Sequence, residues 1–196
     1  MDLYTLHKQA TIKNMMKRAL LLLSLLATPC VATSCKDDTA PATSTAMVLS
    51  LDKLCDIYRL AGASDKEIYI FCAGYEGDTA TLGNLKNRRL IDFYCVGAAA
   101  GGHKELVQLM LDKGANNYND GLAFAALGGH MDIVQLMLDK GADPNNGLSG
   151  AALVGHMDIV QLMLDKGATN LDYALRVSEH FGHTECAELI RAAMRE

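Results

Sequence analysis

Residues 129–142 read GHMDIVQLMLDKGA, and residues 155–168 read GHMDIVQLMLDKGA again, letter for letter. A third copy, GHKELVQLMLDKGA at 102–115, differs at only three positions, and a fainter copy, GHTECAELIRAA, occupies 182–193. The histidines of the four copies are 27, 26 and 27 residues apart, and they are His103, His130, His156 and His183. A fixed period of this length indicates a repeat protein, in which each unit packs only against its neighbours.

Each copy predicts a helix with a broad apolar stripe. Five of the six residues 133–138 are apolar, and we expect this run, Leu136 included, to be buried. Gly141 follows, and glycine readily takes the left-handed conformation that closes a helix. The stretch LAFAALGG at 122–129 predicts a shorter helix whose small alanines let a neighbour approach closely. A unit of two helices cannot bury its own apolar face, so we expect the units to stack. The methionines that recur in the run are also predicted to lie in the core, and they are Met110, Met137 and Met163.

The run A-A-x-x-G-H-x-x-[IV]-V-x-x-[LM]-[LM]-x-x-G-A resembles an ankyrin repeat. One copy is carried by Ala125, Ala126, Gly129, His130, Ile133, Val134, Leu136, Leu138, Gly141 and Ala142. The next copy is carried by Ala151, Ala152, Gly155, His156, Ile159, Val160, Leu162, Leu164, Gly167 and Ala168. An ankyrin unit has about 33 residues and a Thr-Pro-Leu-His turn, of which only Leu122 and Leu148 remain here. The resemblance implies an all-α solenoid of helix-turn-helix units with shortened inter-repeat loops, which holds a partner protein on its loops and first helices.

The repeats divide the C-terminal three quarters of the chain. We assign an ankyrin-like repeat domain to 51–196. Its predicted parts are degenerate N-terminal units at 51–93, clear units at about 94–115, 116–142 and 143–168, and a C-terminal cap at 169–196.

The N-terminal 34 residues have the order of a secretory signal peptide. Basic residues at 13–18 lead into the apolar run ALLLLSLLA at 19–27, and the small-residue stretch TPCVATSC follows at 28–35. The apolar run is too short to span a bilayer, which needs roughly 20 residues. We therefore predict a signal peptide over 1–34 and an exported protein, followed by a flexible polar tether over 35–50.

Two processing sites remain open. Cleavage after Ala32 would release a soluble product, whereas ATSC at 32–35 resembles a bacterial lipobox in which Cys35 is lipidated. The expected location is periplasmic or membrane-tethered if the source is bacterial, and secreted otherwise. A lipid on Cys35 is the one membrane attachment that we predict.

Charge and motifs exclude several classes of function. The formal net charge is −5, and removal of residues 1–34 leaves 14 basic against 22 acidic residues, so nucleic-acid binding is not expected. The sequence contains no Gly-rich phosphate loop, H-E-x-x-H, G-x-S-x-G or Cys-x-x-Cys motif. We therefore predict no catalytic residue, no cofactor and no metal site.

Histidines and cysteines near the C-terminus suggest an alternative. Histidines placed once per repeat lie on helices about 8–10 Å apart and cannot share one metal, so we expect each to open the second helix of its unit. His180, His183 and Cys186 are closer together and have acidic neighbours at Glu179, Glu185 and Glu188. This group could bind a metal or act in catalysis, but Gly182 interrupts the helix between the histidines, which favours a solvated cap.

The four cysteines after the predicted signal are Cys55, Cys72, Cys95 and Cys186. Each could be a small buried hydrophobic residue. The alternative is a disulfide between Cys72 and Cys95 in an oxidising compartment.

Differences between copies indicate where a partner binds. Second helices are nearly identical from unit to unit, whereas the loops and first helices vary. The predicted contact residues are Tyr118, Asn119, Asp120, Phe124, Asn145, Asn146 and Ser149. Tyr118 and Phe124 are the expected anchors because aromatic residues dominate interface energetics. The predicted function is non-enzymatic protein binding; the alternatives are a metal-binding or enzymatic C-terminal group, a host-directed effector and a purely structural array.

Overall fold

The computed structural model describes residues 51, 55, 58–59 and 62–195. The chain divides into two parts, Met1–Gly62 and Ala63–Glu196. Residues described in the first part are helical apart from the turn residue Gly62. The predicted signal peptide at 1–34 and the predicted tether at 35–50, with its candidate lipidation site, lie outside the described residues.

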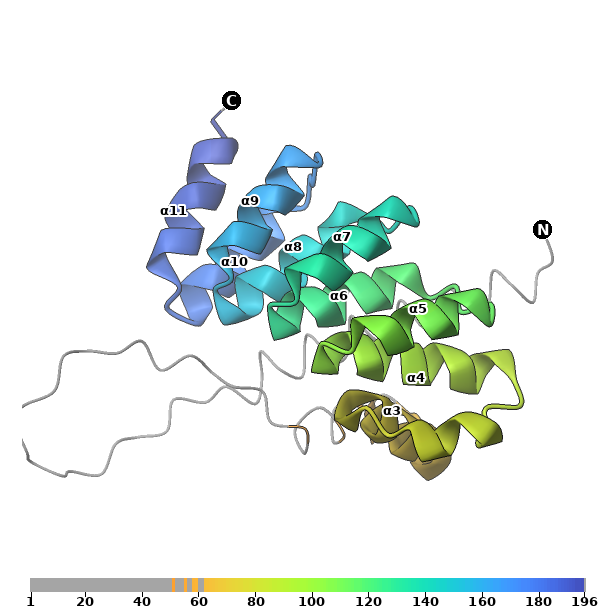
Figure 1. Cartoon of the computed structure of the whole chain (residues 1–196). Coiled ribbons are helices and arrows are strands. Elements are labelled where there is room, and N and C mark those ends of the chain that lie inside the picture. The colour runs from red at the N-terminus through yellow and green to blue at the C-terminus, as the bar shows by residue number, and fades with distance from the viewer. Residues whose placement is uncertain (1–50, 52–54, 56–57, 60–61, 196) are drawn as a thin grey trace, which may run out of the picture. The chain divides into compact units, whose positions relative to one another are not determined.

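The second part is a succession of helices (Figure 1). In chain order they are α3 (Asp65–Glu76), the 3-10 helix η1 (Thr79–Asn84), α4 (Arg88–Gly101), α5 (Lys104–Asp112), α6 (Tyr118–Gly128), α7 (Met131–Asp139), α8 (Pro144–Val154), α9 (Met157–Asp165), α10 (Leu171–His180) and α11 (Thr184–Ala193). None of the helices described for this chain has the length and apolar character needed to cross a membrane.

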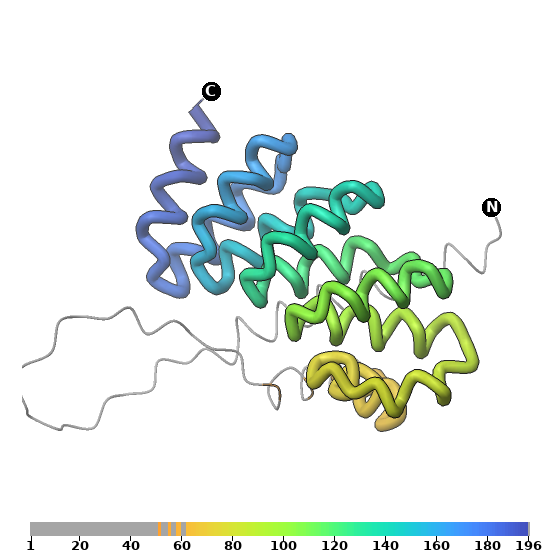
Figure 2. The backbone as a smooth tube through the Cα atoms, viewed as in Figure 1, coloured from red at the N-terminus to blue at the C-terminus, as the bar shows by residue number. Residues whose placement is uncertain are grey.

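These helices form two layers of a solenoid (Figures 1 and 2). The first helices α3, α4, α6, α8 and α10 pack successively on one another, and each of α5, α7, α9 and α11 packs on the first helix that precedes it. Neighbouring second helices contact each other much less. The predicted all-α architecture is therefore confirmed, and the loops 113–117, 140–143 and 166–170 contain no strand.

The N-terminal end of the stack departs from the repeat pattern. The short η1 follows α3 in the place of a second helix. Helix α4 begins at Arg88, before the predicted boundary at 94, because Asn87 caps it and accepts a hydrogen bond from the Leu90 backbone N–H at 2.9 Å. The segment that we assigned to degenerate units thus contributes the first turns of a regular first helix.

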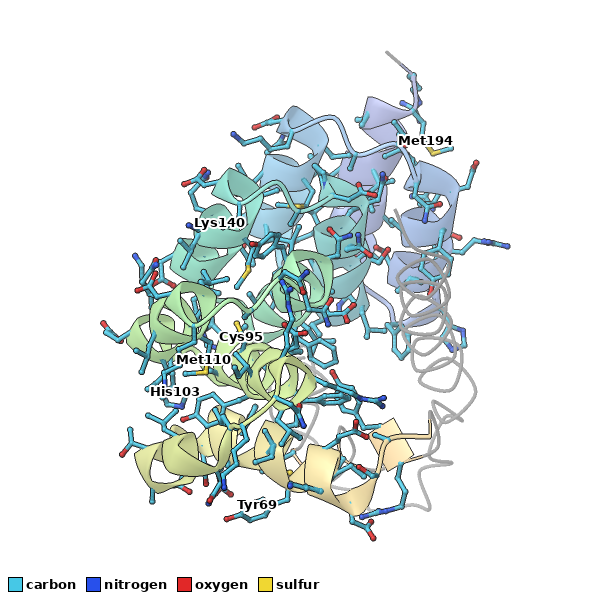
Figure 3. All side chains as sticks on the ribbon, turned by 90° about the vertical axis from the view of Figure 1, so that its right-hand side faces the viewer. Tyr69, Cys95, His103, Met110, Lys140 and Met194 are labelled. Carbon is cyan, nitrogen blue, oxygen red and sulfur yellow. The ribbon has the colours of Figure 1, made fainter. Side chains whose placement is uncertain are left out.

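The core lies between the two layers. Ile133, Val134 and Met137 are fully buried, as are the corresponding methionines of the two adjacent repeats, so the predicted methionine core is confirmed. In Figure 3, Cys95 and Met110 point into the stack, whereas Tyr69 points away from it at the α3 end. The prediction that Leu136 is buried was wrong: this side chain is only partly buried, because neighbouring second helices are in limited contact.

The repeated histidines connect successive repeats. Each begins a second helix, as predicted. The Nε2 atoms of His103, His130 and His183 donate to backbone carbonyls of the preceding repeat at 2.9, 3.1 and 3.0 Å. The ring of His156 lies against Gly129, whose φ is +77° and at which an added Cβ would lie 2.9 Å from the ring. Glycine at this position therefore closes the first helix and makes room for the next histidine.

Candidate functional site

The predicted contact residues lie on two adjacent first helices. Residues 118–120 form the first turn of α6, and Asn145 and Asn146 lie in the first turn of α8. Phe124 and Ser149 lie one turn further along these helices. Because α6 packs on α8, the structure brings the set together. We define the loop face as the loops 113–117, 140–143 and 166–170 with the first turns of α6, α8 and α10.

Side chains at one position per repeat hold these loops in place. Oδ1 of Asp92 accepts a backbone N–H at 3.0 Å, Oδ1 of Asn119 accepts one at 2.7 Å, and Oδ1 of Asn145 accepts one at 2.8 Å. In each case the donor lies 24 residues further along the chain, in the loop that leads to the next first helix. Asn119 and Asn145 therefore have a structural role in the loop face, beyond any contact with a partner.

Sequence reasoning missed these bridges. Its signal was present, since Asp92, Asn119, Asn145 and Asp172 recur at the repeat spacing. The variable sequence around them concealed a position at which a short carbonyl or carboxylate side chain is retained.

Phe124 is buried, with an exposed fraction of 8%. Its ring meets Phe71 in an edge-to-face contact, with ring centroids 5.7 Å apart. These residues come from alternate repeats, and Gly97 occupies the corresponding position of the repeat between them. A Cβ at Gly97 would lie 2.1 Å from the Phe71 carbonyl oxygen, so only glycine permits this close approach. The sequence-based role of Phe124 as an accessible anchor therefore needs correction, because its side chain is part of the core.

Asp120 and Ser149 are also buried, each with an exposed fraction of 7%. Ser149 Oγ donates to the Asn145 carbonyl at 3.0 Å within its own helix. The Asp120 carboxylate accepts from Nδ2 of Asn117. Burial raises the pKa of Asp120 to about 7; the Asn117 hydrogen bond opposes this shift and the nearby charge of Asp92 adds to it.

Tyr118 and Asn146 remain as accessible members of the predicted set. Both side chains are partly exposed, and Nδ2 of Asn146 donates to the Asp143 carbonyl at 3.3 Å. Asn119 and Asn145 are also partly exposed but hold the loops. Tyr118 is therefore the aromatic residue of the set that a partner can reach.

The C-terminal His/Cys/Glu group is dispersed among different contacts. His183 bonds to the preceding repeat, and Cys186 is buried in the stack. Glu179 pairs with Arg191, and the exposed His180 ring meets Phe181 with centroids 5.0 Å apart. Among the described residues, no three His, Cys, Asp or Glu side chains are arranged to hold a metal. These contacts are those of a packed helical cap.

The cysteine alternatives are resolved for the Cys72–Cys95 pair. Cys95 is a buried thiol in the structure, so this disulfide is not formed. Burial, and secondarily the charge of Asp92, raises the pKa of Cys95 to about 12. Burial likewise raises the pKa of Cys186. Both residues act as small hydrophobic side chains, because a thiol is unreactive until it ionises.

Comparison with known proteins identifies one family. No curated protein matches the sequence. The family model of the ankyrin repeat matches residues 122–147, which cover most of α6, all of α7 and the start of α8. This match supports the ankyrin repeat family for the chain.

Proposed function

We propose that this protein is a non-enzymatic protein-binding module and that its partner binds to the loop face. Ankyrin repeats generally bind proteins, and the family is generally non-enzymatic. The observation that carries the proposal for the loop face is the row of side-chain bridges at Asp92, Asn119 and Asn145. They fix successive loops relative to one another before a partner arrives, which reduces the entropy lost on binding.

An apolar row on the loop face also supports the proposal. One partly exposed apolar side chain lies near the start of each first helix, at the repeat spacing. These residues are Ile91, Tyr118, Pro144 and Leu171. Burial of such a row removes apolar area from water, and the polar loop residues beside it supply hydrogen bonds.

The experiment begins with capture of a partner, using the full chain in the compartment where the mature protein resides. Calorimetry with the purified partner then measures its affinity and stoichiometry. Saturable binding that requires the folded repeats supports the module. A captured protein that binds equally well to unfolded chain would contradict it.

We propose in addition that the protein is exported. The order of basic, apolar and small residues over 13–35 supports a signal peptide. Mass spectrometry of protein recovered from its native source should find a new N-terminus near Thr33 or a lipid-modified Cys35. An intact N-terminus in the cytosolic fraction would overturn both forms of this proposal.

A further inference from the structure

Two carboxylates from neighbouring repeats hold the loop between α5 and α6. Oδ1 of Asp92, on α4, accepts the Asn116 backbone N–H at 3.0 Å. Asp120, on α6, accepts from the side chain of Asn117, the next residue of the loop. The loop is therefore attached to both helices by adjacent residues.

Asp120 occupies a position that is neutral in the other repeats. The corresponding residues are Phe93, Asn146 and Tyr173. The Asp120 side chain is nevertheless buried, with an exposed fraction of 7%. An ionised carboxylate in such a position loses hydration, and that loss favours its neutral form.

The helices packed on α6 bring few compensating charges. Helix α8 has no ionisable side chain, and its cap Asp143 is exposed. The ionisable residues of α4, α7 and the α5–α6 loop are Arg88, Arg89, Asp92, Tyr94, Cys95, Asp132, Asp139 and Lys113. Arg89 pairs with Glu67, and Tyr94 and Cys95 are buried and uncharged near pH 7. The remaining residues of this set are exposed except Asp92, which is partly buried and negative.

We propose that Asp92 and Asp120 form a proton-dependent clamp on the α5–α6 loop, which is tight when Asp120 is protonated and loosens when Asp120 ionises beside Asp92. The pKa of Asp120, raised to about 7 by its burial, places this transition near neutral pH. The clamp is a property of the repeats and does not depend on the proposed partner. Its location next to Tyr118 means that ionisation of Asp120 loosens one edge of the loop face.

The direction of the pH dependence follows from proton linkage. Because the folded-state pKa of Asp120 lies above its unfolded value of about 3.9, the folded state binds more protons between these values. The free energy of unfolding contributed by Asp120 is therefore fully present below about pH 4 and is lost as pH rises through 7.

The test compares the unfolding of the full chain with that of Asp120→Asn between pH 5 and pH 8. The variant places the residue of the next repeat, Asn146, in the buried position without a charge. The unfolding constant of the wild type should rise relative to that of the variant by up to about tenfold per pH unit below 7. Histidine titration is common to both proteins and cancels in the ratio. Parallel pH profiles would overturn the clamp.

Asp172→Asn is the matched control, because Asp172 is an exposed carboxylate on a first helix. It should leave the pH profile parallel to that of the wild type. If Asp120→Asn does not fold, carbon NMR of the wild-type Asp120 carboxyl group decides the matter. A titration midpoint near 7 supports the clamp, and a midpoint near the ordinary value of about 3.9 overturns it. Exchange of the Asn116 amide hydrogen should also quicken as Asp120 ionises, beyond the intrinsic effect of pH.

Discussion

The role of a single residue in this stack is decided by residues one and two repeats away. Phe124 differs from its counterparts in the adjacent repeats, and from the sequence this variation indicated a contact residue. The structure shows that Gly97 leaves space in which Phe124 reaches Phe71. Gly150 follows at the same position of the next repeat. Variation between repeats here reflects alternating large and small side chains in one layer of the core.

Phe124→Ala should therefore reduce stability. The change removes a buried ring and leaves a cavity beside Phe71, so we expect the free energy of unfolding to fall by about 3–5 kcal/mol. Chemical denaturation measures this loss. Tyr118→Ala is the control on the same helix, with an expected change below about 1 kcal/mol because its side chain is partly exposed. A Phe124→Ala protein as stable as the control would show that the ring is not part of the core.

At the scale of elements, exact repetition made the helices predictable. Copies of one sequence must solve one packing problem, and they predicted α5, α7 and α9 together with the glycines that precede and follow them. The N-terminal elements lacked such a template. Asn87 as the cap of α4, and η1 after α3, depend on local hydrogen bonds that one eroded copy does not reveal.

The loop bridges were not predictable for a related reason. Asn119 and Asn145 lie in segments that differ in sequence, and only the geometry shows that they accept the same backbone N–H one repeat later. The candidate site was thus predicted in its location and only partly in its residues. Burial within a first helix depends on its two neighbours, which a single repeat sequence does not describe.

Asn119→Ala should weaken the connection between the α7–α8 loop and α6. Loss of the hydrogen bond to the Asp143 N–H should lower the free energy of unfolding by about 1 kcal/mol and speed hydrogen exchange at that amide. Asn116→Ala is the matched control, because Asn116 takes part in its bridge through its backbone N–H alone. Equal exchange rates at Asp143 in the two variants would show that the bridge does not hold the loop.

For the whole molecule, stacking explains both stability and the proposed function. Each repeat buries its apolar stripe only against its neighbours, and α10 and α11 end the stack with exposed polar residues such as Asp172 and Glu188. The same stacking aligns the loops at one side of the first helices. A binding surface assembled in this way extends over several repeats, and its accessible aromatic residue in α6 is Tyr118.

The most direct test of the central claim is calorimetric titration of the captured partner against Tyr118→Ala and Tyr69→Ala. Both variants remove an accessible tyrosine, but Tyr69 lies on α3, outside the loop face, with an exposed fraction of 60%. We predict that Tyr118→Ala weakens binding by more than about 1 kcal/mol while the protein stays folded, as truncation of an interface anchor does. We predict that Tyr69→Ala binds like the wild type. Unchanged affinity of Tyr118→Ala, together with a loss of affinity in Tyr69→Ala, would contradict binding at the loop face.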